Sequence, residues 1–410
     1  MFREDVLRGL RDEYEDDGRI FPAYGSYCFA SVPGTIRSVF DAGGRRSLPD
    51  DVFTGVDTDV ERVVAVVVDG YGLDSWRRDR EAVPFLDRLT ERGTVTPLTS
   101  CFPSETAAAM TTFETGDLPC EHGRVGWNVY ERETDRTFLA FTGEVKSGDE
   151  EGAVADEAFD GVDYHYEDLA AAGIDCHKLE PFDVAVPGVT EHVYDGLDGL
   201  GERLADVTTR SDAPAYVHAY LDHVDRVSHH EGTESDAFRE TVATVCGELS
   251  AFVDGLDDEV ARETLLLVTA DHGHVNTDPE RNVDLSGRER LMEALRRHAD
   301  GTPIRMSGSP RNVHLHLRDG AVPEVREALS DLDVTAFTRD EALDRGLFGD
   351  REPSDRFRRR CGDLVVTHRD LGTWFGDVEA DELDLVGMHG GLHPEEMLVP
   401  FAAVRADQLR

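Results

Sequence analysis

The sequence predicts an α/β protein of three layers, in which helices cover both faces of a mostly parallel central sheet and a small α+β segment is inserted as a cap. Three runs rich in Val, Leu and Ala support this prediction, at residues 63–68, 215–221 and 264–270. Each run is bounded by charged or turn residues and is typical of a strand buried on both faces. Stretches of helical periodicity separate the runs, as crossovers between parallel strands require.

The charge of the chain is strongly negative. The formal net charge is −43, from 85 acidic and 42 basic residues, and the only lysines are Lys146 and Lys178. This composition resembles that of cytosolic proteins from extreme halophiles, where molar salt shortens the Debye length to about 3 Å and screens such self-repulsion. We expect no nucleic acid polymer as a partner, but in molar salt the acidic surface does not exclude a small phosphorylated molecule.

The termini and the cysteines indicate the compartment. The first 20 residues carry too many charges for a signal peptide, and no later stretch approaches 18 apolar residues. We therefore expect a soluble, cytoplasmic protein without a membrane partner. The sparse cysteines show no metal-type spacing and are expected to be free thiols, although a bridge or a thiol nucleophile at Cys101 or Cys120 stays open. The six cysteines are Cys28, Cys101, Cys120, Cys176, Cys246 and Cys361.

With 410 residues, the chain is long enough for one large domain with an insertion. Residues 1–55, a charged amphipathic helix and a passage rich in Gly and Pro, are expected to pack on the core as an N-terminal extension. The core itself is expected at 56–300 and 361–410. Residues 301–360 form the inserted cap, after which the chain is expected to rejoin the main sheet as a strand at 363–367.

A helix N-terminus with a hydroxyl side chain is the first candidate site. In the stretch CFPSETAAAMTTFETGDLPCEHG, a turn at Pro103 and Ser104 places Thr106 on the first turn of an Ala-rich helix. The unpaired N–H groups and partial positive charge of a helix N-terminus attract anions, so the hydroxyl can meet a phosphate. The alternative is that Ser104 or Thr106 only caps the helix.

Each of the three buried strands is followed by residues that can bind a metal. Asp69 follows the first strand, and Asp225 and His229 follow the second, spaced so that both face one side of a helical turn. Asp271 and His272 follow the third, before a glycine that allows both side chains to converge on one cation. A turn carboxylate at the first strand and an acidic loop after the second are the alternatives. Because parallel strands end at one edge of a sheet, we expect these side chains to lie close together.

The C-terminal stretch MHGGLHPEEMLVPFAAV adds His389 and His393 as candidate ligands before a final strand at 398–404. Six nitrogen and oxygen ligands without a thiolate suit two zinc ions, and the three carboxylates are also compatible with manganese. The predicted metal-site residues, together with the nucleophile, are Asp69, Thr106, Asp225, His229, Asp271, His272 and His389.

These motifs resemble those of the alkaline phosphatase superfamily, in particular its type I phosphodiesterase/nucleotide pyrophosphatase branch. The similar motifs are VVVDG, FPSET with a TG ten residues after the Thr, DxxxH, TADHG and HGGLHPEEMLVPF, in this order over residues 62–404. The resemblance implies a three-layer sandwich of alkaline phosphatase type and a two-metal centre. One metal would be held by Asp225, His229 and His389. The second would be held by Asp69, Asp271 and His272, with the oxygen of Thr106 as a further ligand.

The resemblance also implies a reaction, the hydrolysis of a phosphodiester or pyrophosphate bond in a nucleotide-like or other small substrate. A threonine hydroxyl is a poor nucleophile at neutral pH, and coordination of Thr106 to a dication would lower its pKa so that it can attack phosphorus. A second ion about 4 Å away would stabilise the leaving oxygen and then activate the water that hydrolyses the phosphothreonine.

Two features depart from the branch. Its phosphate-contacting Asn lies five residues after the His of the His-Gly pair, where this chain has Trp127, and Asn128 comes one residue later. Asn128 is therefore our candidate substrate-binding residue. Members of the branch are often secreted or membrane-anchored, whereas this chain has no export signal, so an intracellular metabolite is the expected substrate.

Two other functions stay open at this point. A phosphomonoesterase, phosphonate hydrolase or phosphomutase of the same superfamily would be favoured if the cap adds basic groups, such as Arg305 and Arg311, that clamp a dianion. A catalytically silent, metal-stabilised binding protein is the alternative from a different class. Loss of the chemistry would, however, leave no reason for Thr106 to stay in register with six ligands.

Overall fold

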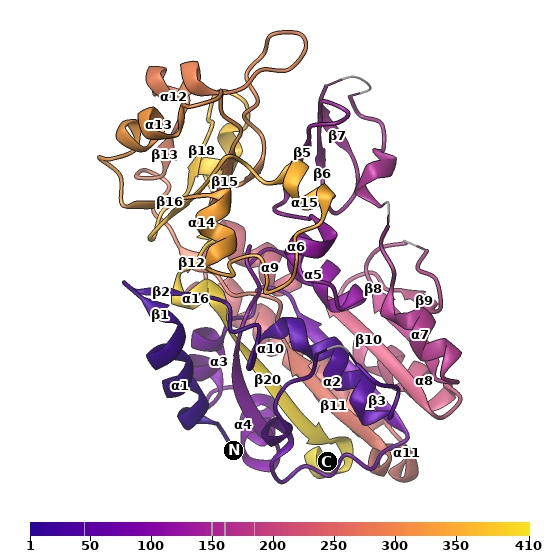
Figure 1. Ribbon diagram of the computed structural model, residues 1–410. Coiled ribbons are helices and arrows are strands. Elements are labelled where there is room, and N and C mark those ends of the chain that lie inside the picture. Colours follow the sequence, from indigo (N-terminus) through magenta and orange to yellow (C-terminus); the bar gives the residue numbers. More distant parts are fainter. Residues whose placement is uncertain (45, 149–150, 160, 184) are drawn as a thin grey trace.

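The computed structural model describes residues 1–410 except 45, 149–150, 160 and 184, and the chain forms two lobes (Figure 1). The lower lobe in Figure 1 contains the central sheet and both termini, and the upper lobe contains a second sheet. No helix in the described part of the chain is long and apolar enough to cross a membrane.

The central sheet has seven strands in the order β4-β20-β11-β3-β10-β8-β9. Six of them run in the same direction, and β20 lies antiparallel between β11 and β4. This mostly parallel sheet confirms the predicted fold class. Its strands are β3 (Arg62–Val68), β4 (Thr94–Thr99), β8 (Asp175–Glu180), β9 (Thr190–Val193), β10 (Ala215–Leu221), β11 (Thr264–Thr269) and β20 (Leu398–Arg405).

Every residue of β3, β10 and β11 is buried, as the continuous apolar runs predict. In register, Val68 pairs with Leu221 and Thr269 pairs with Val67, so the three strands end at one level of the sheet. The residues that follow them therefore emerge at a common edge, which faces the upper lobe (Figure 1).

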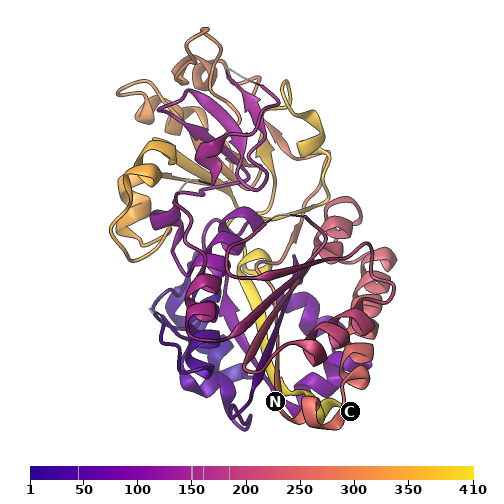
Figure 2. The same cartoon turned by 90° about the vertical axis from the view of Figure 1, so that its right-hand side faces the viewer.

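Helices lie on both sides of the central sheet (Figure 2). On one side α10 packs against α4, α8 and α9, and on the other α5 packs against α2 and α7. The helices of this lobe are α1 (Glu4–Tyr14), α2 (Val32–Val39), α3 (Leu73–Asp79), α4 (Pro84–Arg92), α5 (Thr106–Thr115), α6 (Pro119–His122), α7 (His165–Ala171), α8 (Leu200–Arg210), α9 (His223–Glu231), α10 (Asp236–Gly255), α11 (Asp258–Arg262) and α16 (Pro394–Met397).

The first residues of the chain pack on this lobe. The N–H of Arg3 donates to the carbonyl of Val95 at 2.9 Å, so the N-terminus lies along the edge strand β4. Leu7 and Leu10 of α1 are buried in the main hydrophobic core. A short hairpin of β1 (Glu15–Asp16) and β2 (Arg19–Ile20) follows α1.

The upper lobe is built on an antiparallel sheet in the order β16-β17-β15-β14-β5-β6-β7. It combines two parts of the chain, because β14 pairs with β5 through Gly308 and Asn128. The second sheet therefore reaches beyond the predicted cap at 301–360. Its strands are β5 (Asn128–Glu131), β6 (Arg136–Leu139), β7 (Val145–Ser147), β14 (Gly308–Ser309), β15 (Asn312–Leu315), β16 (Val334–Thr338) and β17 (Leu364–His368).

The expectation that residues 363–367 rejoin the main sheet is wrong. Strand β17 lies between β15 and β16 in the second sheet, and the chain returns to the central sheet only at β20. All of β17 is buried, so its apolar run identifies a central strand but not the sheet to which it belongs.

Short elements complete the upper lobe and the junction between the lobes. The helices are α12 (Glu289–Ala294), α13 (Val322–Ala328), α14 (Arg339–Asp344) and α15 (Asp355–Arg360). The two-stranded ladders pair β12 (Val275–Asn276) with β19 (Gly387–Met388) and β13 (Val283–Asp284) with β18 (Thr373–Trp374). A separate hydrophobic cluster, which includes Leu315, Val366 and Trp374, forms the core of this lobe.

Candidate metal centre

The predicted site residues converge at the edge of the central sheet. Asp69 follows β3 directly and its N–H donates to the carbonyl of Leu221 at 3.0 Å, while Asp271 and His272 follow β11. Helix α9 begins right after β10 and carries Asp225 and His229 on one face, as their spacing predicts. His389 comes from the loop between β19 and α16.

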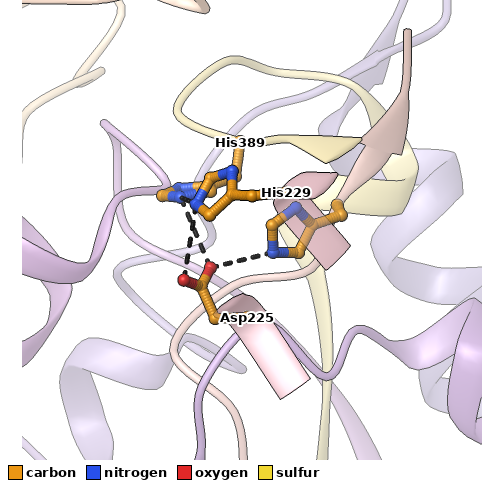
Figure 3. Close-up of side chains that lie close together, drawn as sticks. Asp225, His229 and His389 are labelled. Atoms are coloured by element: carbon orange, nitrogen blue, oxygen red, sulfur yellow. Dashed lines mark hydrogen bonds and ion pairs between the residues drawn. The ribbon is translucent and has the colours of Figure 1, made fainter. Parts of the chain in front are cut away.

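We call the first group the Asp225 site; its predicted members are Asp225, His229 and His389, and His274 lies in the same cluster (Figure 3). His229 Nε2 lies 3.4 Å from Asp225 Oδ2, His389 Nε2 lies 3.5 Å from Asp225 Oδ1, and the two Nε2 atoms are 3.3 Å apart. A tetrahedral zinc site with arms of about 2.0 Å has ligand atoms separated by about 3.3 Å. These three side chains therefore have the spacing of ligands to one ion.

We call the second group the Asp69 site; it consists of Asp69, Asp271, His272 and Thr106. His272 Nε2 lies 3.1 Å from Thr106 Oγ1, 3.3 Å from Asp69 Oδ1 and 3.4 Å from Asp271 Oδ2. Asp69 Oδ1 and Asp271 Oδ2 are buried and have no hydrogen-bond partner. A buried carboxylate oxygen without a partner is costly, and a cation at this position removes the cost. The residues present therefore fit a metal ion.

The histidines of both sites are held in the tautomer that a metal requires. The Nδ1 atoms of His229, His272 and His389 lie 2.9–3.1 Å from the backbone carbonyls of Gly387, Gly273 and Ser104. A carbonyl oxygen only accepts, so each Nδ1 carries a proton, and Nε2 is the nitrogen that is left to face a metal. Such a hydrogen bond from the second ring nitrogen is typical of metal-binding histidines.

The charges at the site are concentrated in a buried volume. Burial, together with the charge of Asp271, raises the pKa of Asp69 well above its ordinary value, and burial also raises the pKa of Asp271. Burial acts on Asp225 in the same direction, but His229 beside it outweighs this and holds the pKa of Asp225 well below its ordinary value. Three carboxyl groups this close together favour a multivalent cation between them.

Thr106 is the first residue of α5, as predicted, and its side chain faces His272. The residue at the N-cap position is Glu105, whose side chain makes no capping hydrogen bond. Ser104 does not cap the helix either, because its Oγ donates to the carbonyl of Gly391 at 2.9 Å and accepts from the N–H of Gly390. The hydroxyl of Thr106 therefore lies in the Asp69 site, next to His272.

A cavity of about 530 Å³ opens onto both sites. One wall is aromatic: Trp127 stacks on Phe141, which contacts Phe182, which in turn contacts Tyr220, with ring centroids 5.4–6.1 Å apart. Asn128 also lines the cavity, and its Oδ1 is buried without a partner. Another cavity of similar volume, about 540 Å³, contains none of the predicted site residues.

Three other candidates lie elsewhere. Arg311, one of the groups by which a phosphomonoesterase could clamp a dianion, is not available for this, because its guanidinium is fully buried in an ion pair with Glu396 at 2.6 Å. Arg305 pairs with Asp377 and does not line the cavity. His393 caps α16, with its Nδ1 accepting from a backbone N–H.

The cysteine prediction is confirmed, because all six cysteines are buried free thiols. A bridge between Cys101 and Cys120 is therefore absent. Burial raises the pKa of both thiols, which opposes a nucleophilic thiolate.

The sequence reasoning missed two residues next to the ligands. His274 Nε2 lies 2.9 Å from Asp225 Oδ1, and the hydroxyl of Tyr220 donates to Asp69 Oδ2. The repeat of His272 and His274 two positions apart was a usable signal, since residues at that spacing share a face in extended backbone. Tyr220 lies inside a buried apolar run and gave no such signal.

The fold is of the alkaline phosphatase type, and its cavity opens onto the candidate metal groups. The sequence profile of the type I phosphodiesterase / nucleotide pyrophosphatase family matches residues 63–392. The chain therefore belongs to this family, and the resemblance seen in the motifs is confirmed.

Solved structures share the fold at low sequence identity. Murine ectonucleotide pyrophosphatase / phosphodiesterase 5 superposes with a TM-score of 0.63 at 17% identity, over 83% of this chain and 87% of that protein. An inactive form of the same murine protein in complex with AMP gives 0.62 at 16%, over 84% and 88%. Phosphonoacetate hydrolase from Sinorhizobium meliloti, in complex with phosphonoformate, gives 0.59 at 18%, over 85% and 94%. No curated protein sequence matches the chain.

Proposed function

We propose that this protein is a two-metal phosphodiesterase that cleaves a phosphodiester or pyrophosphate bond in a small, nucleotide-like substrate through a phosphothreonine on Thr106. The observation that supports this most is the position of Thr106 Oγ1, on the first turn of α5 and 3.1 Å from His272 Nε2 in the Asp69 site. Zinc is the metal we expect because each site has imidazole ligands, and manganese is the alternative.

Each protein group then has one role. The Asp69 and Asp225 sites would hold two metal ions, whose chemistry would be to lower the pKa of a nearby hydroxyl and to stabilise negative charge. Thr106 Oγ1 attacks phosphorus, the leaving oxygen departs, and water later hydrolyses the phosphothreonine. The first N–H groups of α5 have no acceptor within the helix and can stabilise charge on the non-bridging oxygens.

The charges around the cavity favour a diester over a monoester. A monoester phosphate is a dianion, which needs an additional cationic group for binding. Arg226 is the only Lys or Arg among the described residues that line the cavity, and Glu105, Asp222 and Glu382 add carboxyl groups there. A singly charged diester or pyrophosphate linkage suits this lining better.

The aromatic wall favours a substrate with a flat or apolar group. The rings of Trp127, Phe141, Phe182 and Tyr220 offer faces on which a base can stack. A structural relative binds AMP, which supports a nucleotide-like substrate here.

The proposal is tested with a matched pair of aryl phosphates, bis(4-nitrophenyl) phosphate and 4-nitrophenyl phosphate, in molar KCl with Zn²⁺ or Mn²⁺. Thr106→Ala is the control for background hydrolysis. We expect kcat/KM to be at least about 10-fold higher for the diester, a difference of about 1.4 kcal/mol. A preference for the monoester would contradict the diester assignment and favour a phosphatase of the same superfamily.

A further inference from the structure

Two side chains outside the predicted ligand set each hydrogen-bond to one metal-site carboxylate. His274 contacts Asp225 in one site, and Tyr220 contacts Asp69 in the other. We propose that these two residues are positioning residues, each of which fixes the carboxylate of a single site so that a defined oxygen is offered to the metal. This inference rests on the two-metal centre of the proposed function.

His274 differs from the other three histidines of the centre in how its ring is held. The others direct Nδ1 at a backbone carbonyl, whereas Nδ1 of His274 is buried without a hydrogen-bond partner. Its contact is instead made by Nε2, 2.9 Å from Asp225 Oδ1. An ionised carboxylate only accepts, so His274 Nε2 carries the proton and has no lone pair for a metal. His274 therefore acts on Asp225 and not as a further ligand.

The surrounding backbone packs closely against the His274 ring. Its side chain is fully buried, at 0% exposure. A Cβ on Gly70 would lie 2.7 Å from His274 Nε2, and a Cβ on Gly387 would lie 3.2 Å from Nδ1. The two glycines belong to the loop after β3 and to β19, so separate segments enclose the imidazole from both sides. The hydrogen bond to Asp225 is thus made by a rigidly held donor.

The position of Asp225 explains why such a donor is useful. Asp225 belongs to two sets of closely spaced potential ligands. It lies near His229 and His389 of the Asp225 site, and it also lies near Asp69 and His272 of the other site. A carboxylate between two cations can be drawn to either one. With Oδ1 held by His274, Oδ2 stays 3.4 Å from His229 Nε2, where the Asp225 site needs it.

Tyr220 has the same relation to Asp69. It lies near the end of β10, its side chain is buried, and its hydroxyl donates to Asp69 Oδ2. The other oxygen, Oδ1, has no hydrogen-bond partner and lies 3.3 Å from His272 Nε2. The hydroxyl of Tyr220 therefore selects Oδ1 of Asp69 for the Asp69 site.

Outer hydrogen bonds of this kind commonly change metal affinity by about 10- to 100-fold when they are removed. The two donors differ in which carboxylate they hold, so the structure predicts two separable effects. Loss of the His274 donor weakens the Asp225 site, and loss of the Tyr220 hydroxyl weakens the Asp69 site.

These effects can be measured as metal affinity, without an activity assay, in variants that retain only one of the two metal sites. Asp271→Asn leaves the Asp225 site as the intact one, and His389→Ala leaves the Asp69 site. Zn²⁺ affinity is then measured in each background against a competing chelator in molar KCl, for His274→Phe and Tyr220→Phe. Tyr194→Phe is the matched control, because its buried hydroxyl donates to a backbone carbonyl, that of Tyr220, and not to a metal-site carboxylate.

We expect His274→Phe to weaken Zn²⁺ binding by about 10- to 100-fold in the Asp271→Asn background and by less than about threefold in the His389→Ala background. Tyr220→Phe should show the reverse pattern, and the control should change neither. Equal weakening of both sites by either variant, or no weakening by either, would overturn the proposal.

Two further measurements separate the hydrogen-bond role from a packing role, and this inference from the proposed function. His274→Gln retains an N–H donor and should bind Zn²⁺ more tightly than His274→Phe in the Asp271→Asn background; equal loss in both would contradict the hydrogen-bond role. The metal content of the wild-type protein tests the proposed function separately, since a chain that holds two ions but ignores both substitutions contradicts only this inference.

Discussion

The two lobes contribute different things to the cavity. The edge of the central sheet supplies the candidate metal-site carboxylates, His272 and Thr106, the nucleophile that we propose, all from positions just after a strand or near the start of a helix. The upper lobe supplies Trp127, Asn128 and Ser309, which line the cavity but belong to neither metal site. The difference teaches that the proposed bond cleavage depends on the lower lobe, whereas substrate contacts come from both lobes, since Phe182 and Tyr220 belong to the lower one. Substitutions in the upper lobe should therefore affect substrate binding without affecting the metal sites.

The largest expected effect is a loss of activity on substitution of Thr106 in the lower lobe. Thr106→Ala should lower kcat/KM for the aryl diester by at least about 1,000-fold, or roughly 4 kcal/mol, because no other hydroxyl occupies the position of the nucleophile. Six protein ligands remain, so the metal content should stay largely intact. Near-normal turnover of this variant would show that a metal-activated water attacks the substrate directly.

The junction between the lobes gives the next largest effect. Arg311 follows β14 of the upper lobe, and Glu396 lies in α16 of the lower lobe, with both side chains at 0% exposure. Arg311→Met should lower the free energy of unfolding by about 3–5 kcal/mol, because it leaves the Glu396 charge buried and unpaired. Denaturant unfolding in molar KCl measures this loss.

Arg305 provides the matched control for that measurement. It lies six residues earlier, and its partner Asp377 is 49% exposed. Arg305→Met should change the free energy of unfolding by no more than about 1 kcal/mol, as is usual for surface pairs. Equal losses for Arg305→Met and Arg311→Met would contradict the claim that the buried pair connects the two lobes.

The smallest expected effect concerns substrate selection. Trp127→Ala removes a ring that stacks on Phe141 and should raise KM for the aryl diester by roughly 3- to 10-fold, or about 0.5–1.5 kcal/mol. Because Trp127 is absent from both metal groups, the metal content should not change. A loss of bound metal in this variant would show that the lobes are coupled more closely than the comparison implies.

The sequence made the lower lobe largely predictable. Continuous apolar runs identified β3, β10 and β11, and the residues after them were found because parallel strands end at one edge. The spacing of Asp225 and His229 matched a helical turn that the structure contains. These patterns involve residues close together in the sequence, so they can be recognised without knowledge of the tertiary structure.

The upper lobe was less predictable, because its features depend on pairings between distant segments. The link from Asn128 to Gly308 joins strands about 180 residues apart, and nothing local in either strand indicates the partner. The same limit explains the wrong assignment of 363–367 to the main sheet. It also explains why the sequence did not show that Arg311 is paired with Glu396 of the other lobe.

The most direct test of the two-metal centre is the metal content of the purified protein after dialysis in molar KCl. The account predicts two equivalents of Zn²⁺ or Mn²⁺ per chain and a higher unfolding midpoint when either ion is added, because only the folded state assembles both sites. A content well under one equivalent, with no stabilisation by either ion, would contradict it.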